Sequence, residues 1–158
     1  YPMIWDSAKD FQVFDATGNC WIDFTSTIFV ANSGHGNDAI IQALKDVLDK
    51  PLLHTYTYPH QYRIDYLDLL IKQTPKQFEK GFMVSSGTEA TEVALKLMRM
   101  HGQTINKEKK VIVCFEGNWH GRTLGAQMMC GNDAQKEWIG YRTAREGPTY
   151  SRLEPDAT

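Results

Sequence analysis

The sequence is short of cysteine, and its three cysteines, Cys20, Cys114 and Cys130, form no close pair along the chain. Such a set predicts neither a disulfide framework nor a zinc ribbon and fits a reducing compartment, so we expect a cytoplasmic location. No apolar run reaches membrane-spanning length. The net charge is only −2, with both signs mixed along the chain, which gives no support for nucleic acid or a membrane as a partner. A small molecule is the favoured ligand.

The sequence also lacks the spacings that hold a metal ion. None of its five histidines stands in a ligand pattern such as His-Glu-x-x-His; they are His35, His54, His60, His101 and His120. We therefore predict no metal site. The 158 residues, 42% of them hydrophobic and 23% charged, are enough for about one ordinary globular domain.

The first fifty residues predict a hairpin followed by a helix. Two short aromatic-rich runs, 11–14 and 21–24, flank a turn and are typical of a β-hairpin. A helix capped by Asn37 or Asp38 follows and ends before Pro51. We assign no chemistry to this part of the chain.

The next stretch is crowded with tyrosine and histidine. Residues 52–62 suit a substrate mouth or a subunit interface, because tyrosine joins apolar area to a polar end; simple loop packing is the alternative. A second amphipathic helix is expected over 65–73.

Residues 81–100 predict a strand, a turn and a helix. The run 81–84 is apolar, and after the turn apolar residues recur at helical spacing, namely Ala90, Val93, Ala94, Leu97 and Met100. Ser86 and Glu89 stand three apart, the capping-box arrangement in which each side chain satisfies the other residue's backbone N–H. Gly87 permits close approach to the backbone, Thr88 offers a hydroxyl, and a helix N-terminus attracts anions. The pattern predicts a phosphate site or, as the alternative, a well-capped helix with nothing bound.

A second strand and a polar loop follow. Residues 111–115 are β-branched and aromatic and predict a buried strand, which would complete a parallel strand, helix and strand unit. The loop 116–123 after it carries glycines, an aromatic, a histidine and an arginine. Since ligands of open α/β sheets lie outside the carboxyl ends of the strands, this loop and the turn at residues 86–88 are expected to face one crevice.

Two motifs in this order resemble a known family. Residues 85–97 (SSGTEATEVALKL) and 117–125 (GNWHGRTLG) are similar to the class III, or omega, aminotransferases of pyridoxal phosphate fold type I. The resemblance extends upstream through 21–26 (WIDFTS), 34–36 (GHG) and 52–55 (LLHT). In the family the Gly-His pair usually continues with His-Pro, which is absent here, and we assign His35 a structural role.

The resemblance implies an α/β fold. The chain would form part of the fold type I large domain, a mostly parallel sheet with flanking helices, preceded by a small N-terminal β-hairpin segment. The implied divisions are an N-terminal segment over 1–50, the start of the cofactor-binding domain over 51–141, and an unassigned tail over 142–158. The motifs are closest to those of the 4-aminobutyrate, ornithine and acetylornithine aminotransferases. The implied partners are amine or amino-acid and oxoacid substrates and a second subunit in a homodimer.

The resemblance also assigns the candidate site residues. Gly87 and Thr88 stand at the positions that bind the phosphate of pyridoxal phosphate, and Ser86 caps the helix and is a weaker contact. Trp119 stands where the family stacks an aromatic on the pyridine ring, with His120 beside it shaping the loop. The arginine of this run grips the substrate carboxylate in relatives, so Arg122 is the substrate-binding candidate; a surface arginine paired with Glu116 is the alternative.

Two catalytic groups are not identifiable. The lysine that forms the Schiff base and the aspartate at the pyridine nitrogen lie well downstream of these motifs in the family, and no lysine here has the required context. The chain looks like roughly the first third of such an enzyme, and we do not expect it to transaminate alone. The competing interpretation is a non-catalytic fragment or partner subunit that binds a phosphate ligand. A nucleotide-binding enzyme is disfavoured because both glycine-rich nucleotide motifs are missing.

Overall fold

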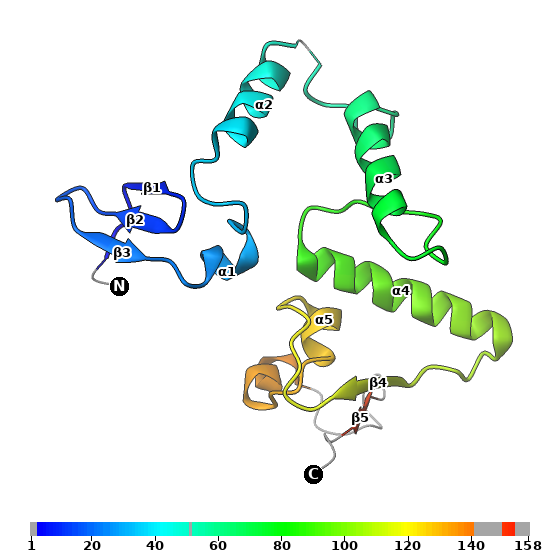
Figure 1. Ribbon diagram of the computed structural model, residues 1–158. Coiled ribbons are helices and arrows are strands. Elements are labelled where there is room, and N and C mark those ends of the chain that lie inside the picture. The colour runs from blue at the N-terminus through cyan, green and yellow to red at the C-terminus, as the bar shows by residue number, and fades with distance from the viewer. Residues whose placement is uncertain (1–2, 51, 141–149, 154–158) are drawn as a thin grey trace. The chain divides into compact units, whose positions relative to one another are not determined.

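A computed structural model describes residues 3–50 and 52–140, and the backbone of 150–153 (Figure 1). The chain divides into two compact units, Tyr1–Asp68 and Leu69–Thr158. The domain boundaries expected from the sequence refer to a longer enzyme and stay a prediction.

The first unit contains a three-stranded antiparallel sheet. Its strands are β1 (Ser7–Lys9), β2 (Gln12–Phe14) and β3 (Cys20–Ile22), in that order across the sheet. The predicted hairpin is confirmed as β2 and β3, with Val13 paired to Trp21 and almost fully buried. Asp15 stabilises the turn by accepting hydrogen bonds from the N–H groups of Thr17 and Asn19. The strand β1 was not predicted, because its polar residues carry no apolar alternation.

A left-handed turn follows the sheet. The short element α1 (Ser26–Phe29) has positive φ throughout, including 54° at Thr27 and 58° at Ile28. Left-handed backbone costs roughly 1–2 kcal/mol per residue, and β-branched side chains fit it poorly. The carboxylate of Asp23 compensates by accepting hydrogen bonds from the N–H groups of Thr25 and Thr27, both at 3.0 Å.

Two longer helices complete this part of the chain. The helix α2 (Asp38–Leu48) is capped as predicted, since Asn37 Oδ1 accepts from the N–H groups of Ala39 and Ile40 at 3.1 and 3.2 Å. Its apolar stripe is exposed, with Leu44 at 60%. The helix α3 (Gln61–Gln73) begins four residues before the predicted start, because Gln61 and Asp65 bond across its first turn at 2.7 Å.

The second unit is organised around α4 (Gly87–Ile105), shown in green in Figure 1. The strand predicted at 81–84 is absent from the described structure. An isolated strand is unstable, and these four residues have no neighbouring strand with which to pair. The helix predicted after the turn is confirmed as α4, whose buried residues are Leu95 and Gly102, while Leu97 is exposed.

The predicted second strand is confirmed as β4 (Ile112–Phe115), but its parallel partner differs from the prediction. It pairs with β5 (Tyr150–Leu153), from the part of the sequence that shows no periodicity. The connection contains two short elements, the helix α5 (Leu124–Met128), which the sequence does not predict, and the 3₁₀ helix η1 (Ala134–Ile139). Successive side chains of a strand point to opposite faces, so Val113 and Phe115 lie on the face away from Cys114 and are exposed rather than buried.

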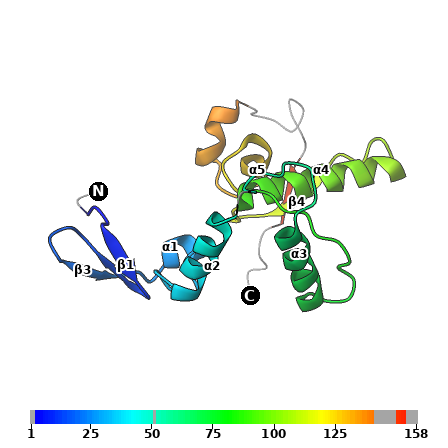
Figure 2. The ribbon, with the colours of Figure 1, turned by 90° about the horizontal axis from the view of Figure 1, so that it is seen from above.

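A small apolar core joins these elements. Leu95 of α4, Cys114 of β4 and Met129 form one cluster, and Ile112 packs against it. The helix α5 lies beside α4 in both ribbon views (Figure 1 and Figure 2), in agreement with the packing between them. In the part of the chain that the structure describes, no helix has the length and apolar character needed to cross a membrane.

Candidate functional site

The helix start at Ser86 is built largely as the sequence predicts. Ser86 is extended (φ −152°, ψ 163°), and its hydroxyl accepts a hydrogen bond from the N–H of Glu89 at 3.2 Å. The reciprocal bond differs from the expected capping box, because Glu89 Oε2 accepts from the N–H of Ser85, at 2.6 Å, and not from that of Ser86. The helix therefore begins at Gly87 with its first turn fixed.

The first turn of α4 presents an open cradle for an anion. A side chain added at Gly87 would meet no atom within 4 Å. Among the hydrogen bonds of the described residues, none uses the backbone N–H of Gly87 or Thr88. Unpaired N–H groups at the positive end of a 19-residue helix attract an anion, so these residues fit the phosphate of a cofactor.

The two sequence motifs meet in space. Gly121, with φ of 137°, packs on the side chain of Thr88 so closely that an added Cβ would lie 2.5 Å from its hydroxyl and 3.0 Å from its Cβ. Only glycine allows this contact. The turn at residues 86–88 and the loop 116–123 therefore share one place in the structure, as the sequence predicts.

A second contact between these segments was not foreseen. Glu92, one turn beyond Thr88 on α4, accepts hydrogen bonds from the hydroxyl of Thr123 and, at 3.0 Å, from the N–H of Ala126. In the sequence Glu92 is only one residue of the motif 85–97. Glu92 contacts residues that lie more than thirty positions away in the sequence, so no local pattern predicts the contact. The one signal in the sequence is the spacing of four between Thr88 and Glu92, which places both residues on the same face of α4.

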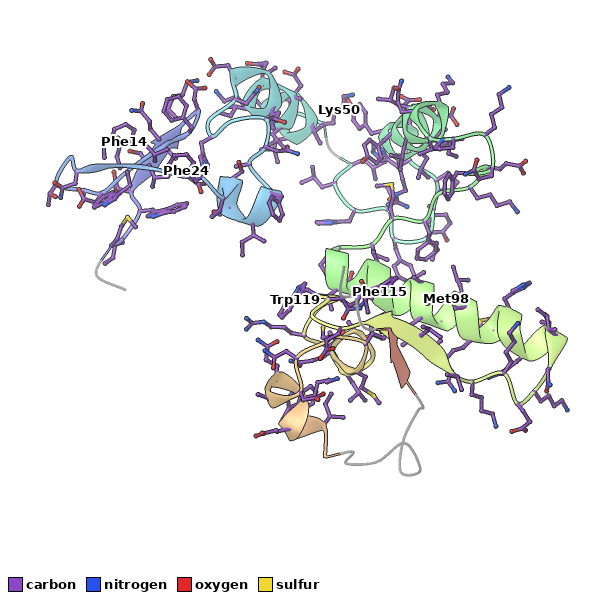
Figure 3. The ribbon with its side chains drawn as sticks, turned by 60° about the horizontal axis from the view of Figure 1, so that its bottom comes forward. Phe14, Phe24, Lys50, Met98, Phe115 and Trp119 are labelled. Atoms are coloured by element: carbon purple, nitrogen blue, oxygen red, sulfur yellow. The ribbon has the colours of Figure 1, made fainter. Side chains whose placement is uncertain are left out.

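The aromatic and the arginine of the loop contact each other. The guanidinium carbon of Arg122 lies 5.5 Å from the centroid of the Trp119 ring, a cation–π contact. Trp119 follows the end of β4 (Figure 3) and is 56% exposed, so its ring has surface available to a flat ligand. Among the described residues no ion pair joins Arg122 to Glu116. The guanidinium is exposed and near the loop surface, where it can reach a carboxylate.

His120 is held by its own loop. One of its ring nitrogens, Nε2, lies 2.8 Å from Asn118 Nδ2, and its backbone N–H donates to the buried thiol of Cys130 at 3.2 Å. Both contacts fix the shape of the loop, which is the role the sequence suggests for it. The other amide atom of Asn118, Oδ1, is buried without a hydrogen-bond partner among the described residues.

An apolar groove of about 570 Å³ lies between α4 and β4. Its walls include Ala94, Met98, Ile112 and Cys114, and of the predicted site residues it touches only His120. Burial raises the pKa of the Cys114 thiol, which keeps it protonated and unreactive. The groove is therefore not the cofactor cradle.

A separate polar cluster stabilises the first unit. His35 Nε2 lies 2.8 Å from the carboxylate of Asp23, and the ring of Trp5 packs edge-on against the imidazole at 6.0 Å. The hydrogen bond from His35, with others from Thr25 and Thr27, lowers the pKa of Asp23 to about 2. The described residues contain no group of three side chains that could bind a metal ion.

Comparison with known proteins identifies related chains. The family model for class-III aminotransferases matches residues 1–147. The acetylornithine aminotransferase of Clostridium acetobutylicum is 32% identical over 141 residues, which cover 87% of this chain and 35% of that protein. The mitochondrial acetylornithine aminotransferase of Saccharomyces cerevisiae is 34% identical over 132 residues, covering 80% of this chain and 31% of that protein.

The fold is also found in solved structures. The ornithine aminotransferase of Toxoplasma gondii superposes with a TM-score of 0.84 at 20% identity, covering 99% of this chain and 36% of that one. This likeness shows the fold and confirms the expected α/β class with its small N-terminal sheet. The chain spans about a third of the length of the relatives it matches.

Proposed function

The chain belongs to the class-III aminotransferases, and on this premise we propose that its protein moves an amino group from an omega-amino or amino-acid donor to a 2-oxoacid, with pyridoxal phosphate as cofactor. The observation that carries the proposal is the contact of Thr88 with Gly121, which brings the two family motifs together. This contact supports the proposal that the open helix start and the Trp119 loop belong to one site.

The phosphate end of the site is the first turn of α4. The N–H groups of Gly87 and Thr88 and the Thr88 hydroxyl donate to the phosphate, while Ser86 holds the turn by capping the helix. The space at Gly87 lets the phosphate reach the backbone. Because these donors are fixed before the ligand arrives, little ordering is required on binding.

The loop after β4 supplies the other contacts. Trp119 presents its exposed ring to the pyridine ring, and Arg122, in contact with Trp119, binds the substrate carboxylate through its paired N–H donors. His120 keeps the loop in shape through Asn118 and Cys130. When bound, pyridoxal phosphate supplies the electron sink through which the amino group is transferred.

Further parts of the proposal concern the whole protein. The lysine that bonds the cofactor and the carboxylate at the pyridine nitrogen would come from residues outside this chain. The enzyme would be a homodimer, with 52–62 at the shared edge; the exposure of Tyr56 and Tyr58, 89% and 75%, supports this choice. A cytoplasmic location stays a prediction, since the yeast relative above is named as mitochondrial.

The test is intact mass spectrometry after incubation with pyridoxal phosphate and borohydride reduction. We expect the enzyme that carries this chain to gain one cofactor and to form glutamate from 2-oxoglutarate with 4-aminobutyrate, ornithine or N-acetylornithine as donor. Thr88→Val, which keeps the side-chain shape but removes the hydroxyl, should weaken cofactor binding about tenfold. The matched control is Thr104→Val at the far end of α4, where the hydroxyl bonds only to His101 O. An unmodified mass with no glutamate formed would favour the non-catalytic alternative.

A further inference from the structure

We propose that Glu92 is a positioning residue for the substrate carboxylate, because it fixes the loop that carries Arg122. The inference rests on the proposed function and deepens it: the arginine would bind a carboxylate-bearing amine, and Glu92 would set where it does so. In this proposal Glu92 acts through Thr123 and Ala126 and not by binding the cofactor or the substrate.

Arg122 lies between two anchors on the same helix. Its neighbour Gly121 packs on Thr88, and its other neighbour Thr123 donates its hydroxyl to Glu92. Thr88 and Glu92 are four apart on α4 and therefore lie on one face. The backbone of Arg122 is thus held on both sides by the helix whose first turn forms the phosphate cradle.

The carboxylate of Glu92 also replaces a missing cap. Thr123 is the residue before α5, yet its side chain makes no capping bond to that helix. Glu92 Oε1 accepts instead from the N–H of Ala126 at 3.0 Å, in the first turn of α5. A negative charge at a helix N-terminus is favourable, so one oxygen atom holds both the end of the loop and the start of the next helix.

The packing leaves this carboxylate little freedom. A Cβ added at Gly125 would overlap Glu92 Oε2 and lie 2.8 Å from Leu95 Cδ2, so α5 sits directly on α4 at this point. Gly125 of α5 therefore packs directly against Glu92 and Leu95 of α4. The spacing between the phosphate cradle and Arg122 is fixed by these contacts, and small displacements of a binding group lower activity strongly.

The first measurement is amide hydrogen exchange on the complete enzyme without added cofactor. Glu92→Ala should raise the exchange of residues 121–126 about tenfold or more and leave 97–105 unchanged. Glu92→Gln keeps an acceptor oxygen and should stay within about threefold of the wild type. Lys96→Ala, one turn further along α4 and exposed, is the matched control and should change nothing. Unaltered exchange in Glu92→Ala would overturn the proposal.

The second measurement is steady-state kinetics of the complete enzyme. Glu92→Ala should raise the KM for 4-aminobutyrate at least tenfold with kcat within about threefold, while kcat/KM for butylamine, which lacks the carboxylate, changes less than twofold. Thr123→Val, which removes one of the two hydrogen bonds to Glu92, should raise the same KM by a smaller factor. The double variant should be no worse than Glu92→Ala, because Thr123 acts only through Glu92.

These results separate the possible failures. If Glu92→Ala lowers kcat/KM equally for 4-aminobutyrate and for butylamine, Glu92 is a structural residue and the positioning role is wrong. If the wild-type enzyme transfers no amino group, the proposed function fails and the positioning role with it, while hydrogen exchange still reports on the contact itself.

Discussion

At the scale of single residues, Gly121 is a position that a side chain cannot occupy without strain. Its φ of 137° disfavours any side chain, and Thr88 fills the space that a Cβ would need. We expect Gly121→Ala to lower the free energy of unfolding by about 1–3 kcal/mol, measured by urea denaturation of the complete enzyme. The control is Gly140→Ala, where φ is 77° and the space is open, so only the conformational part of the cost applies. Equal losses in the two variants would show that the contact with Thr88 does not matter.

The low pKa of Asp23 predicts how stability depends on pH. His35, Thr25 and Thr27 hold the pKa near 2, below the ordinary value of 3.8, so the unfolded carboxyl takes up a proton at higher pH than the folded one. The contribution of Asp23 is therefore complete above about pH 4 and is lost as the pH falls toward 2. Asp23→Asn should remove this part of the pH dependence, measured by denaturation with circular dichroism from about pH 5 downward. A parallel pH dependence in wild type and variant would contradict the assignment.

The role of a residue can be predicted from the sequence when its partners are close to it along the chain. Ser86 and Asn37 act on N–H groups two or three positions away, and both were predicted as caps. Glu92 bonds to Thr123 and Ala126, and Gly121 packs on Thr88. These partners lie more than thirty positions apart in the sequence, so local patterns cannot predict the contacts. The resemblance to a family supplied Arg122 and Trp119, and the structure adds that they touch.

At the scale of elements, the start of α4 serves both the helix and the proposed phosphate site, and one substitution separates these roles. Ser86→Ala should destabilise the helix by about 1 kcal/mol, because it leaves the N–H of Glu89 without its partner. Ser86→Asp keeps a good cap but adds a negative charge beside the cradle. We expect it to preserve stability while weakening the binding of pyridoxal phosphate, as followed by thermal unfolding and by titration of the complete enzyme. Unchanged affinity in Ser86→Asp would place the phosphate elsewhere.

Elements were predictable where their own residues suffice to form them. The helix α2 and the hairpin of β2 and β3 carry caps, turns and alternation of their own. The run 81–84 has the composition of a strand, but a strand forms only with a neighbour, and none of the described strands pairs with it. The converse holds for β5, whose residues show no pattern and which is a strand because β4 lies beside it.

At the scale of the whole molecule, the chain exposes much apolar surface. Among the described residues only six apolar side chains are buried, whereas Phe24, Phe82 and Val30 are each more than 75% exposed. We expect the 158-residue chain alone to bind a hydrophobic dye strongly and to unfold over a broad range of denaturant, because its core is small. The complete enzyme should bind far less dye. A sharp transition without dye binding in the isolated chain would contradict this expectation.

The pairing of β4 with β5 has a consequence for the order of folding. The two strands are parallel and are joined through α5 and η1, so the pair can close only after that whole connection has been synthesised. The helices α4 and α5 can dock first, because both are synthesised before β5. On the ribosome the newly made chain would therefore pass through a stage in which β4 has both edges free, and chaperone binding would be concentrated at that stage.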